Sequence, residues 1–443
     1  MRRIVWLILI GLALVAGKGW AGPARVAVFV NLERLPGFRV ILRVEGVHLL
    51  GKGREEVLPL VSREIDTGLP FGQGLLAFGE VPAGKYRGLK LCLSGVKVRG
   101  REWKGGSIER VYPVSLDLRN GETTSLFVSW DVAGSLGGKA FVPRFSVRRQ
   151  ENPLPGENLF VDTPDTDTVW VITTDTNRVV YSLGICEGPR GMAVAPGGQR
   201  FYVVCEGERA VKVVGMRSFR VEDVIPVPLL TSPRYLALGP EGRALITSPD
   251  DRMLALVDLE RGVLVRSQRL NYQPGEVVYL SEGQRFAVSS PVEGVVYFFD
   301  TDLNPAGRLS AGFAPRGLAS DREYFYVTDE EGGVHFYRLP GLESEGRVET
   351  CFGPERVLSV DGRVLVSCSG GELAVLLEGH LTVSRRLSVG RGAFSMVYYA
   401  PRRWVYVALR EAGAVAVVDF NRERVVGKIE VGGRPFELVV NSF

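Results

Sequence analysis

The sequence lacks most of the residues and motifs that mark the common enzyme classes. It contains only three histidines, His48, His335 and His380, in separate parts of the chain. Such scattered histidines form no His-rich metal centre unless the fold gathers them. The chain also has no Gly-x-Ser-x-Gly elbow, phosphate loop, dinucleotide fingerprint or His-Glu-x-x-His motif. We therefore expect no metal and no cofactor, and the sequence singles out no catalytic residue.

Lysine is scarce as well, with nine lysines against 45 arginines. The formal net charge is only +4 over 443 residues. The charges alternate in sign, and none of the charged runs is long enough to form a nucleic-acid-binding tail. We therefore expect no nucleic-acid partner.

The chain has one long apolar run, Ile4–Gly17, which follows the positive start Met1–Arg3. The small residues Gly19 and Ala21 lie at the −3 and −1 positions of a cleavage site. This pattern predicts a secretory signal peptide over residues 1–21, because the run is short for a membrane span. The alternative is an uncleaved N-terminal anchor. We expect a periplasmic or extracellular protein without a membrane span after cleavage.

A unit of about 40 residues recurs through the later two thirds of the chain. Each copy contains four short segments rich in Val, Ile, Leu, Tyr and Phe, separated by turn residues. Four antiparallel strands per repeat predict the blade of a β-propeller. The residues that open the copies are 44, 41, 41, 39, 39 and 42 residues apart, namely Pro189, Pro233, Pro274, Pro315, Pro354, Ala393 and Pro435.

The two ends of the repeat region complement each other. Phe436–Val440 supplies only the first strand of a further copy, whereas Leu159–Gly184 supplies the other three. Pairing these segments would close the ring and cover two exposed edges. The sequence therefore predicts a seven-bladed propeller over residues 159–443. Six blades are the alternative if the copy near Pro274 or Ala393 is not a true blade.

The earlier part of the chain alternates apolar and polar residues without this repeat. Segments such as ARVAVFVNLE (Ala24–Glu33) and TSLFVSWDV (Thr124–Val132) predict strands of a β-sandwich over residues 23–149. The stretch QENPLPGENL contains two prolines and mixed charges, so residues 150–158 read as a linker. The predicted fold class is all-β.

Four of the five cysteines share one arrangement. Cys186 and Cys351 each lie three residues before a repeat-opening proline, and Cys205 and Cys368 each end the second strand that follows. Both positions lie on the same face of a blade. We therefore predict the disulfides Cys186–Cys205 and Cys351–Cys368; the alternative is four small apolar residues buried at strand ends. Cys92 is expected to be a buried free thiol.

Arginines gather beside the repeat-opening residues, where the inner strands converge on the central channel. Their side chains could surround one mouth of the channel and bind an anionic ligand. The alternative is a set of loop arginines that pair with carboxylates such as Glu187 and Glu355. The five arginines, called the mouth arginines below, are Arg190, Arg234, Arg316, Arg356 and Arg434.

The acidic stretch Asp162–Asp167 carries alternating carboxylates. Such oxygens could hold Ca²⁺, but the glycine at the sharp turn and the bidentate glutamate of a calcium loop are missing. We interpret the stretch as a turn between strands.

The repeats resemble the YVTN family of β-propellers. The resemblance is carried by Phe201–Val204, Pro315–Ala319, Tyr326–Asp329 and the segment TDTNRVVYSLG from Thr174, and it covers residues 159–443. The family's asparagine at the end of the second strand is replaced in every copy, by Cys205, Ser248, Ser290, Asp329, Cys368 and Leu409. The resemblance implies the propeller fold. Its relatives include exported and surface-layer proteins, lactonase-like proteins and quinone-dependent dehydrogenases.

The first domain resembles an uncharacterised family of exported, prealbumin-like sandwich domains, the domain of unknown function 4382. The resemblance is carried by PAGKYRGLKLCL (Pro82–Leu93) and by SLDLRNGETTSLFVSWDVAGSL (Ser115–Leu136). It implies a fold and a cell-surface setting but no chemistry.

These observations favour a non-catalytic binding or scaffolding protein of the cell envelope. We expect a monomer whose partner is an envelope protein or a small anionic ligand. The alternative is an extracytoplasmic propeller enzyme, either a lactonase-like hydrolase or a quinone-dependent dehydrogenase. A structural component of a surface layer is a third hypothesis.

Overall fold

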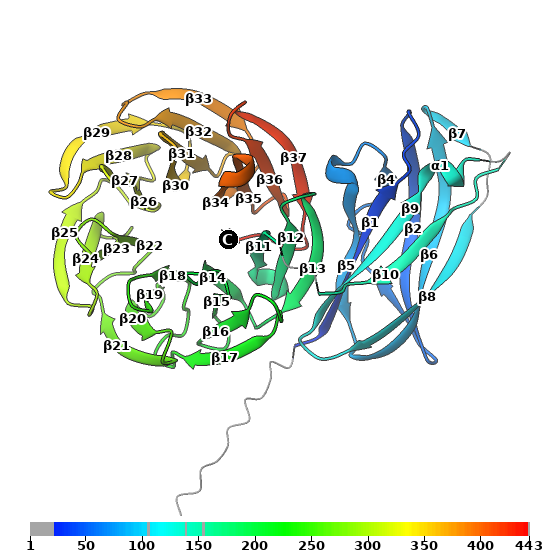
Figure 1. Ribbon diagram of the computed structural model, residues 1–443, viewed down its shortest axis with the longest axis horizontal. Helices are drawn as coiled ribbons and strands as arrows, with labels where there is room; N and C mark the ends of the chain where they lie inside the picture. Colours follow the sequence, from blue (N-terminus) through cyan, green and yellow to red (C-terminus); the bar gives the residue numbers. More distant parts are fainter. Residues whose placement is uncertain (1–21, 104–106, 138–139, 153–155, 442–443) are drawn as a thin grey trace, which may run out of the picture.

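The chain forms a ring of β-sheets and, beside it, a second body made of two sheets (Figure 1). The computed structural model describes residues 22–103, 107–137, 140–152 and 156–441, so the predicted signal peptide lies outside the described residues. Within these ranges, no helix has the length and apolar character needed to cross a membrane. The helical segments are single turns: η1 (Pro70–Gly72), α1 (Val132–Ser135), η2 (Pro164–Thr166) and η3 (Ala400–Arg402).

The N-terminal body consists of two sheets that share one apolar core. The first sheet has the order β10 (Phe145–Arg149), β9 (Thr123–Asp131), β1 (Ala24–Glu33) and β5 (Gln73–Val81). The second sheet is built on β2 and β6, and its strands are β2 (Val40–Gly51), β3 (Glu55–Leu58), β4 (Glu64–Asp66), β6 (Gly84–Val98), β7 (Arg101–Trp103) and β8 (Ile108–Leu118). Alternate residues of each sheet point into this core, as a period of two requires.

The ring contains seven four-stranded antiparallel sheets in the described residues, each running from an inner to an outer strand. The inner strands are β14 (Pro189–Val194), β18 (Tyr235–Leu238), β22 (Val277–Leu280), β26 (Leu318–Ser320), β30 (Pro354–Val360), β34 (Ala393–Tyr399) and β38 (Leu438–Val440). The second strands are β11 (Asn158–Thr163), β15 (Arg200–Cys205), β19 (Arg243–Ser248), β23 (Arg285–Ser290), β27 (Tyr324–Thr328), β31 (Arg363–Cys368) and β35 (Trp404–Leu409). This arrangement is that of a β-propeller.

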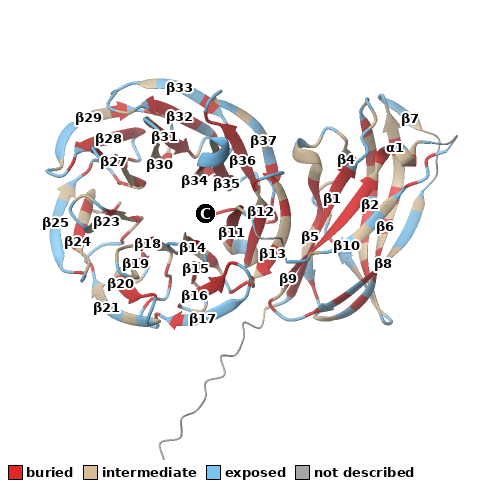
Figure 2. Ribbon diagram, viewed as in Figure 1, coloured by how far each residue is buried: buried red, intermediate tan, exposed pale blue. Residues whose placement is uncertain are grey.

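The third and outer strands complete each sheet. The third strands are β12 (Thr168–Thr173), β16 (Ala210–Gly215), β20 (Met253–Asp258), β24 (Val295–Asp300), β28 (Gly333–Arg338), β32 (Glu372–Leu377) and β36 (Ala414–Asp419). The outer strands are β13 (Arg178–Gly184), β17 (Val221–Pro226), β21 (Val263–Arg269), β25 (Pro305–Ser310), β29 (Glu343–Glu349), β33 (Val383–Ser388) and β37 (Arg424–Glu430). The third strands are largely buried and most outer strands largely exposed, as Figure 2 shows. Each sheet therefore packs on its two neighbours and turns its outer edge to solvent.

The two ends of the ring segment meet in one sheet, as the sequence predicted. Strand β38 pairs antiparallel with β11, so that Val440 lies opposite Leu159. The observed strand is shorter than the predicted one, Phe436–Val440, although Phe436 and Glu437 still form backbone hydrogen bonds with Asp162 of β11. We call the sheet β13-β12-β11-β38 the closing sheet.

The acidic stretch forms the turn between β11 and β12, as interpreted from the sequence. Its carboxylates bind backbone groups of the neighbouring segments. Asp162 Oδ1 accepts a hydrogen bond from the Glu437 amide at 2.6 Å, and Asp165 Oδ1 accepts one from the Arg434 amide at 2.8 Å. The turn thus fastens the C-terminal segment to the closing sheet.

The N-terminal body packs directly on the closing sheet. Trp170 on β12 is fully buried and contacts the rings of Phe29 and Phe78 from the first sheet, with centroids 5.9 and 5.6 Å away. A single apolar core contains residues of both bodies. Gly184, at the end of β13, lies so close to Gly121 that an added Cβ would be 2.0 Å from the Gly121 carbonyl oxygen. The two bodies therefore meet through a close-packed junction.

Candidate functional site

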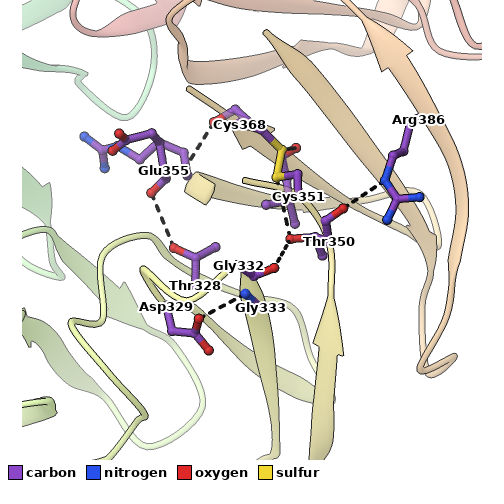
Figure 3. The surroundings of a disulfide bond; sticks show 12 residues. Thr328, Asp329, Gly332, Gly333, Thr350, Cys351, Glu355, Cys368 and Arg386 are labelled. Carbon is purple, nitrogen blue, oxygen red and sulfur yellow. Dashed lines mark hydrogen bonds between the residues drawn. A yellow bond between two sulfur atoms is a disulfide. The ribbon is translucent and has the colours of Figure 1, made fainter. Parts of the chain in front are cut away.

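The structure contains both predicted disulfides, on the face of the ring where the inner strands begin. Cys186 bonds Cys205 and Cys351 bonds Cys368, with Cα atoms 5.8 and 6.2 Å apart. Figure 3 shows the second bond beside Glu355 and Thr350. The fifth cysteine, Cys92, is free and partly buried, and burial raises the pKa of its thiol. Because disulfides persist in oxidising compartments, the two bonds fit an exported protein.

Three of the mouth arginines form ion pairs close to the channel mouth. Arg190 pairs with Glu206, and Arg234 lies 3.6 Å from the same carboxylate. Arg316 lies 2.9 Å from Glu330 and 3.3 Å from Glu355. The guanidinium groups at these positions are therefore largely neutralised by glutamates.

Arg356 lies deeper and connects three sheets across the channel. It is buried and pairs with Glu276 from the sheet of β22 and, at 3.5 Å, with Glu437 from the closing sheet. Its guanidinium also lies over the rings of Tyr235 and Phe394, at 5.0 and 4.8 Å. A buried charge removed from water needs such partners to be tolerated. Arg356 therefore acts as a structural cross-link of the inner strands.

A pocket of about 560 Å³ opens beside this network, between the last two repeat sheets and the closing sheet. We call it the mouth pocket. It is lined by Glu355, Ser369, Gly392, Ala393, Phe394, Arg410, Glu411 and Arg434.

Two arginines of the mouth pocket have no carboxylate partner within 4 Å among the described residues, namely Arg410 and Arg434. Arg410 follows β35, and its partly buried guanidinium lies over the rings of Phe394 and Phe436, at 4.9 and 5.7 Å. Burial lowers the pKa of Arg410; the charge of Glu355 opposes this effect, whereas the charges of Arg190 and Arg434 add to it. A partly desolvated cation without a direct ion pair favours an anion in the pocket.

Glu355 provides the opposite wall of the pocket. Burial raises the pKa of its carboxyl group, although the attraction of Arg316 opposes this effect. Its backbone carbonyl accepts a hydrogen bond from Thr328 at 3.4 Å (Figure 3). The carboxylate is thus engaged by Arg316 and leaves Arg410 without a direct ion pair.

The structure brings the five mouth arginines to one face but gives them unequal roles. Of the five, only Arg434 lines the mouth pocket. Arg410 was not among the predicted site residues, because it follows the second strand of its copy and does not lie beside a repeat-opening residue. The residue after each second strand lies on the same face of the ring as the repeat-opening residues. This shared position could have pointed to Arg410.

Another buried charge cluster lies in the sheet of β28. Asp329 accepts hydrogen bonds from His335 Nε2 at 2.8 Å and from Arg347 Nε at 2.6 Å. Burial by itself would raise the pKa of the Asp329 carboxyl group. The hydrogen bonds from His335 and Arg347 outweigh burial, so the pKa of Asp329 lies well below its usual value. Among the described residues, no group of three or more His, Cys, Asp or Glu side chains is arranged to hold a metal ion. Asp329 closes the turn before Gly333 and is structural.

Comparisons with known proteins identify the fold. No family model matches the chain, and no curated protein matches it. Two solved structures provisionally assigned as 6-phosphogluconolactonases, from Bacteroides fragilis and Bacteroides uniformis, superpose with TM-scores of 0.57 and 0.58 at 13% identity. They cover 65% of this chain and 98% and 100% of their own. A functionally unknown protein from Desulfotomaculum acetoxidans gives 0.57 at 12% identity, covering 64% of this chain and 98% of its own. At such identities the likeness shows the β-propeller fold alone.

Proposed function

We propose that this chain is an exported, non-catalytic binding protein of the cell envelope. Its parts are a prealbumin-like β-sandwich (23–149) of the type of domain of unknown function 4382, a linker (150–158) and a seven-bladed YVTN-type propeller (159–443). The shared core of the two N-terminal sheets supports the sandwich, and the seven four-stranded sheets support the blade number. The two disulfides support export.

The unpaired guanidinium groups in the mouth pocket are the observation that carries the binding function. We propose that Arg410 and Arg434 bind the charged group of a small anionic ligand. Arg190, Arg234, Arg316 and Arg356 pair with glutamates and do not line this pocket, so they hold its surroundings in place and leave the ligand to Arg410 and Arg434. Because Phe394 lines the pocket, an anion with an apolar ring fits it better than a fully polar anion.

Isothermal titration calorimetry with benzoate tests this proposal. We expect one benzoate to bind per chain, and the Arg410→Gln variant to bind at least tenfold more weakly, which corresponds to about 1.4 kcal/mol. Arg252→Gln serves as the control, because Arg252 is an exposed arginine in a turn of another sheet. The proposal is wrong if the intact protein does not bind benzoate, or if both variants bind it as the unaltered protein does.

The alternative is an extracytoplasmic propeller enzyme. It is favoured by the likeness to structures provisionally assigned as lactonases, since these act on a small, charged substrate according to their assignment. Assays of lactone hydrolysis and of quinone-coupled oxidation separate the two functions. Turnover that Arg410→Gln abolishes would support the enzyme, whereas benzoate binding without turnover supports the binding protein.

A further inference from the structure

A second pocket, which we call the junction cleft, lies between the N-terminal body and the closing sheet. Its volume is about 620 Å³. The N-terminal strands β1, β5, β9 and β10 line one side, and β11, β12 and β13 line the other. The residues that matter for its chemistry are Asn31, Gln73, Arg148, Asp175 and Arg178. A pocket of this size between two packed bodies is a common place for a ligand.

The floor of the junction cleft is fixed by one side chain that connects the two bodies. Gln73 Nε2 donates hydrogen bonds to Asn31 Oδ1 at 2.9 Å and to the Val179 carbonyl at 3.0 Å. Its Oε1 accepts a hydrogen bond from the Val179 amide at 2.8 Å. Both ends of this amide are therefore occupied, so the floor needs no rearrangement when a ligand binds.

Arg178 is the most constrained cation in the cleft. Its Nε donates to the Phe71 carbonyl at 2.6 Å, so a turn of the N-terminal body orients a side chain of β13. Burial lowers the pKa of Arg178, and Glu33 opposes this effect only from a distance. None of the carboxylates in the described residues lies within ion-pair distance of it. Its terminal nitrogens thus form a preoriented, uncompensated donor pair.

A further arginine comes from the edge strand β10. Arg148 lies opposite Phe127 of the junction core, so its side chain leaves β10 on the face of the cleft, whereas Arg149 lies opposite Leu126 of the N-terminal core and points the other way. Arg148 is exposed and forms no ion pair with the described residues. The cleft also contains the carboxylates of Glu151 and Asp175, but Asp175 pairs with Arg402 at 3.3 Å. Arg148 and Arg178 therefore outnumber the carboxylates that lack an ion pair, which leaves the cleft positive.

We propose that the junction cleft binds a polar ligand with two or more oxyanion charges, either carboxylates or phosphates, through Arg148 and Arg178. Planar guanidinium groups bind such oxygens in pairs, and two of them match two charges. The site is separate from the mouth pocket and does not depend on the function proposed for it. Because its arginines come from both bodies, the ligand fastens the junction when it binds.

Calorimetric titrations with citrate and with inorganic phosphate, at constant ionic strength, test this site. We expect citrate to bind the full chain, and Arg148→Gln and Arg178→Gln each to weaken it at least tenfold. Arg252→Gln, an exposed arginine in a turn of another sheet, and Arg410→Gln, in the mouth pocket, should leave citrate binding unchanged. If phosphate binds at the same arginines, a phosphate group is an accepted ligand; if only citrate does, the site is specific for carboxylates.

Several outcomes would overturn the proposal. Citrate that fails to bind, or that binds Arg148→Gln and Arg178→Gln as tightly as the natural protein, rules out the site. An equal loss in Arg252→Gln indicates general attraction to surface charge, and a loss confined to Arg410→Gln assigns citrate to the mouth pocket. Since Arg178 also bonds the Phe71 carbonyl across the junction, the melting temperature of Arg178→Gln is measured alongside. Arg148 makes no contact of this kind and is a valid test by itself.

Discussion

At the scale of single residues, Asp162 is the most unusual group in the closing sheet. Asp162 is fully buried. One of its carboxylate oxygens accepts a hydrogen bond from the Glu437 amide, and the other has no hydrogen-bond partner in the described part of the chain. Burial raises the pKa of Asp162 well above its usual value; the hydrogen bond from the Glu437 amide and the charge of Arg190 oppose this shift, whereas the charge of the Glu437 carboxylate adds to it. The folded protein therefore favours the protonated carboxyl group.

This raised pKa gives a pH dependence of known sign. The pKa of this carboxyl group is about 3.9 in the unfolded chain and higher in the folded protein. At pH values between the two, the folded state holds a proton that the unfolded state has lost. The stability of the natural protein therefore falls as the pH rises through this range. An asparagine does not titrate. We expect Asp162→Asn to gain at least about 1 kcal/mol relative to the natural protein between pH 4 and pH 8.

Guanidinium unfolding at several pH values measures this difference. Asp117→Asn, which removes one exposed carboxylate, corrects for the general effect of losing a charge. Parallel stability curves for the natural protein and Asp162→Asn would show that the carboxyl group does not respond to its buried position.

At the scale of elements, the ring depends on the very short strand β38. Only three of its residues pair with β11, but Leu438 is 3% exposed and belongs to the core that includes Trp170. The two disulfides stiffen the same face, closing loops with sequence separations of 19 and 17 residues. Short loops of this kind contribute about 3 kcal/mol each in the chain-entropy account.

Shortening one side chain of β38 should therefore weaken the whole ring. We expect Leu438→Ala to lower the free energy of unfolding by about 2–5 kcal/mol, through lost burial and the cavity left behind. Val224→Ala, on the exposed outer strand β17, should change it by less than about 0.5 kcal/mol. Equal effects of the two substitutions in chemical denaturation would mean that β38 adds little to closure.

At the scale of the whole molecule, the propeller and the N-terminal body share a core. Both faces of β1 are buried: Val26 and Val28 point into the N-terminal core, whereas Ala27 and Phe29 point into the junction core. On the other side, β13 is the outer strand that the N-terminal body covers, and it is more buried than β17 or β25 (Figure 2). A shared core of this kind couples the unfolding of two bodies.

We therefore expect one cooperative thermal transition for the full chain, and a disrupted junction in Gly184→Ala. The added methyl group would collide with the Gly121 carbonyl, so the two bodies should separate and unfold in two transitions. Gly37→Ala is the matched control, because nothing lies within 4 Å of its added Cβ. Calorimetry, combined with the fluorescence of buried Trp170, measures both. Two transitions in the natural protein, or one in Gly184→Ala, would contradict this coupling.

Much of the architecture was predictable because it depends on local, repeated patterns. The spacing between Pro189, Pro233 and the other repeat-opening residues equals the length of one four-stranded unit. This length does not depend on the neighbouring units. The pairing of Cys186 with Cys205 follows from their places on one face of such a unit, and Cys351 and Cys368 occupy the same two places in another copy. The first copy lacks one strand and the last copy consists of one strand. Because an unpaired strand edge is unfavourable, the two were predictably joined in one sheet.

The sequence by itself therefore determined the strands, the ring and the cysteine pairs, because these follow from spacing along the chain. Only the tertiary structure decided which charges lack a partner. Arg316 and Arg434 both lie beside a repeat-opening proline in the sequence, but glutamates from neighbouring turns reach the first and not the second. The junction was decided in the same way, because contacts such as Phe29 with Trp170 depend on distances in space between residues far apart in the chain.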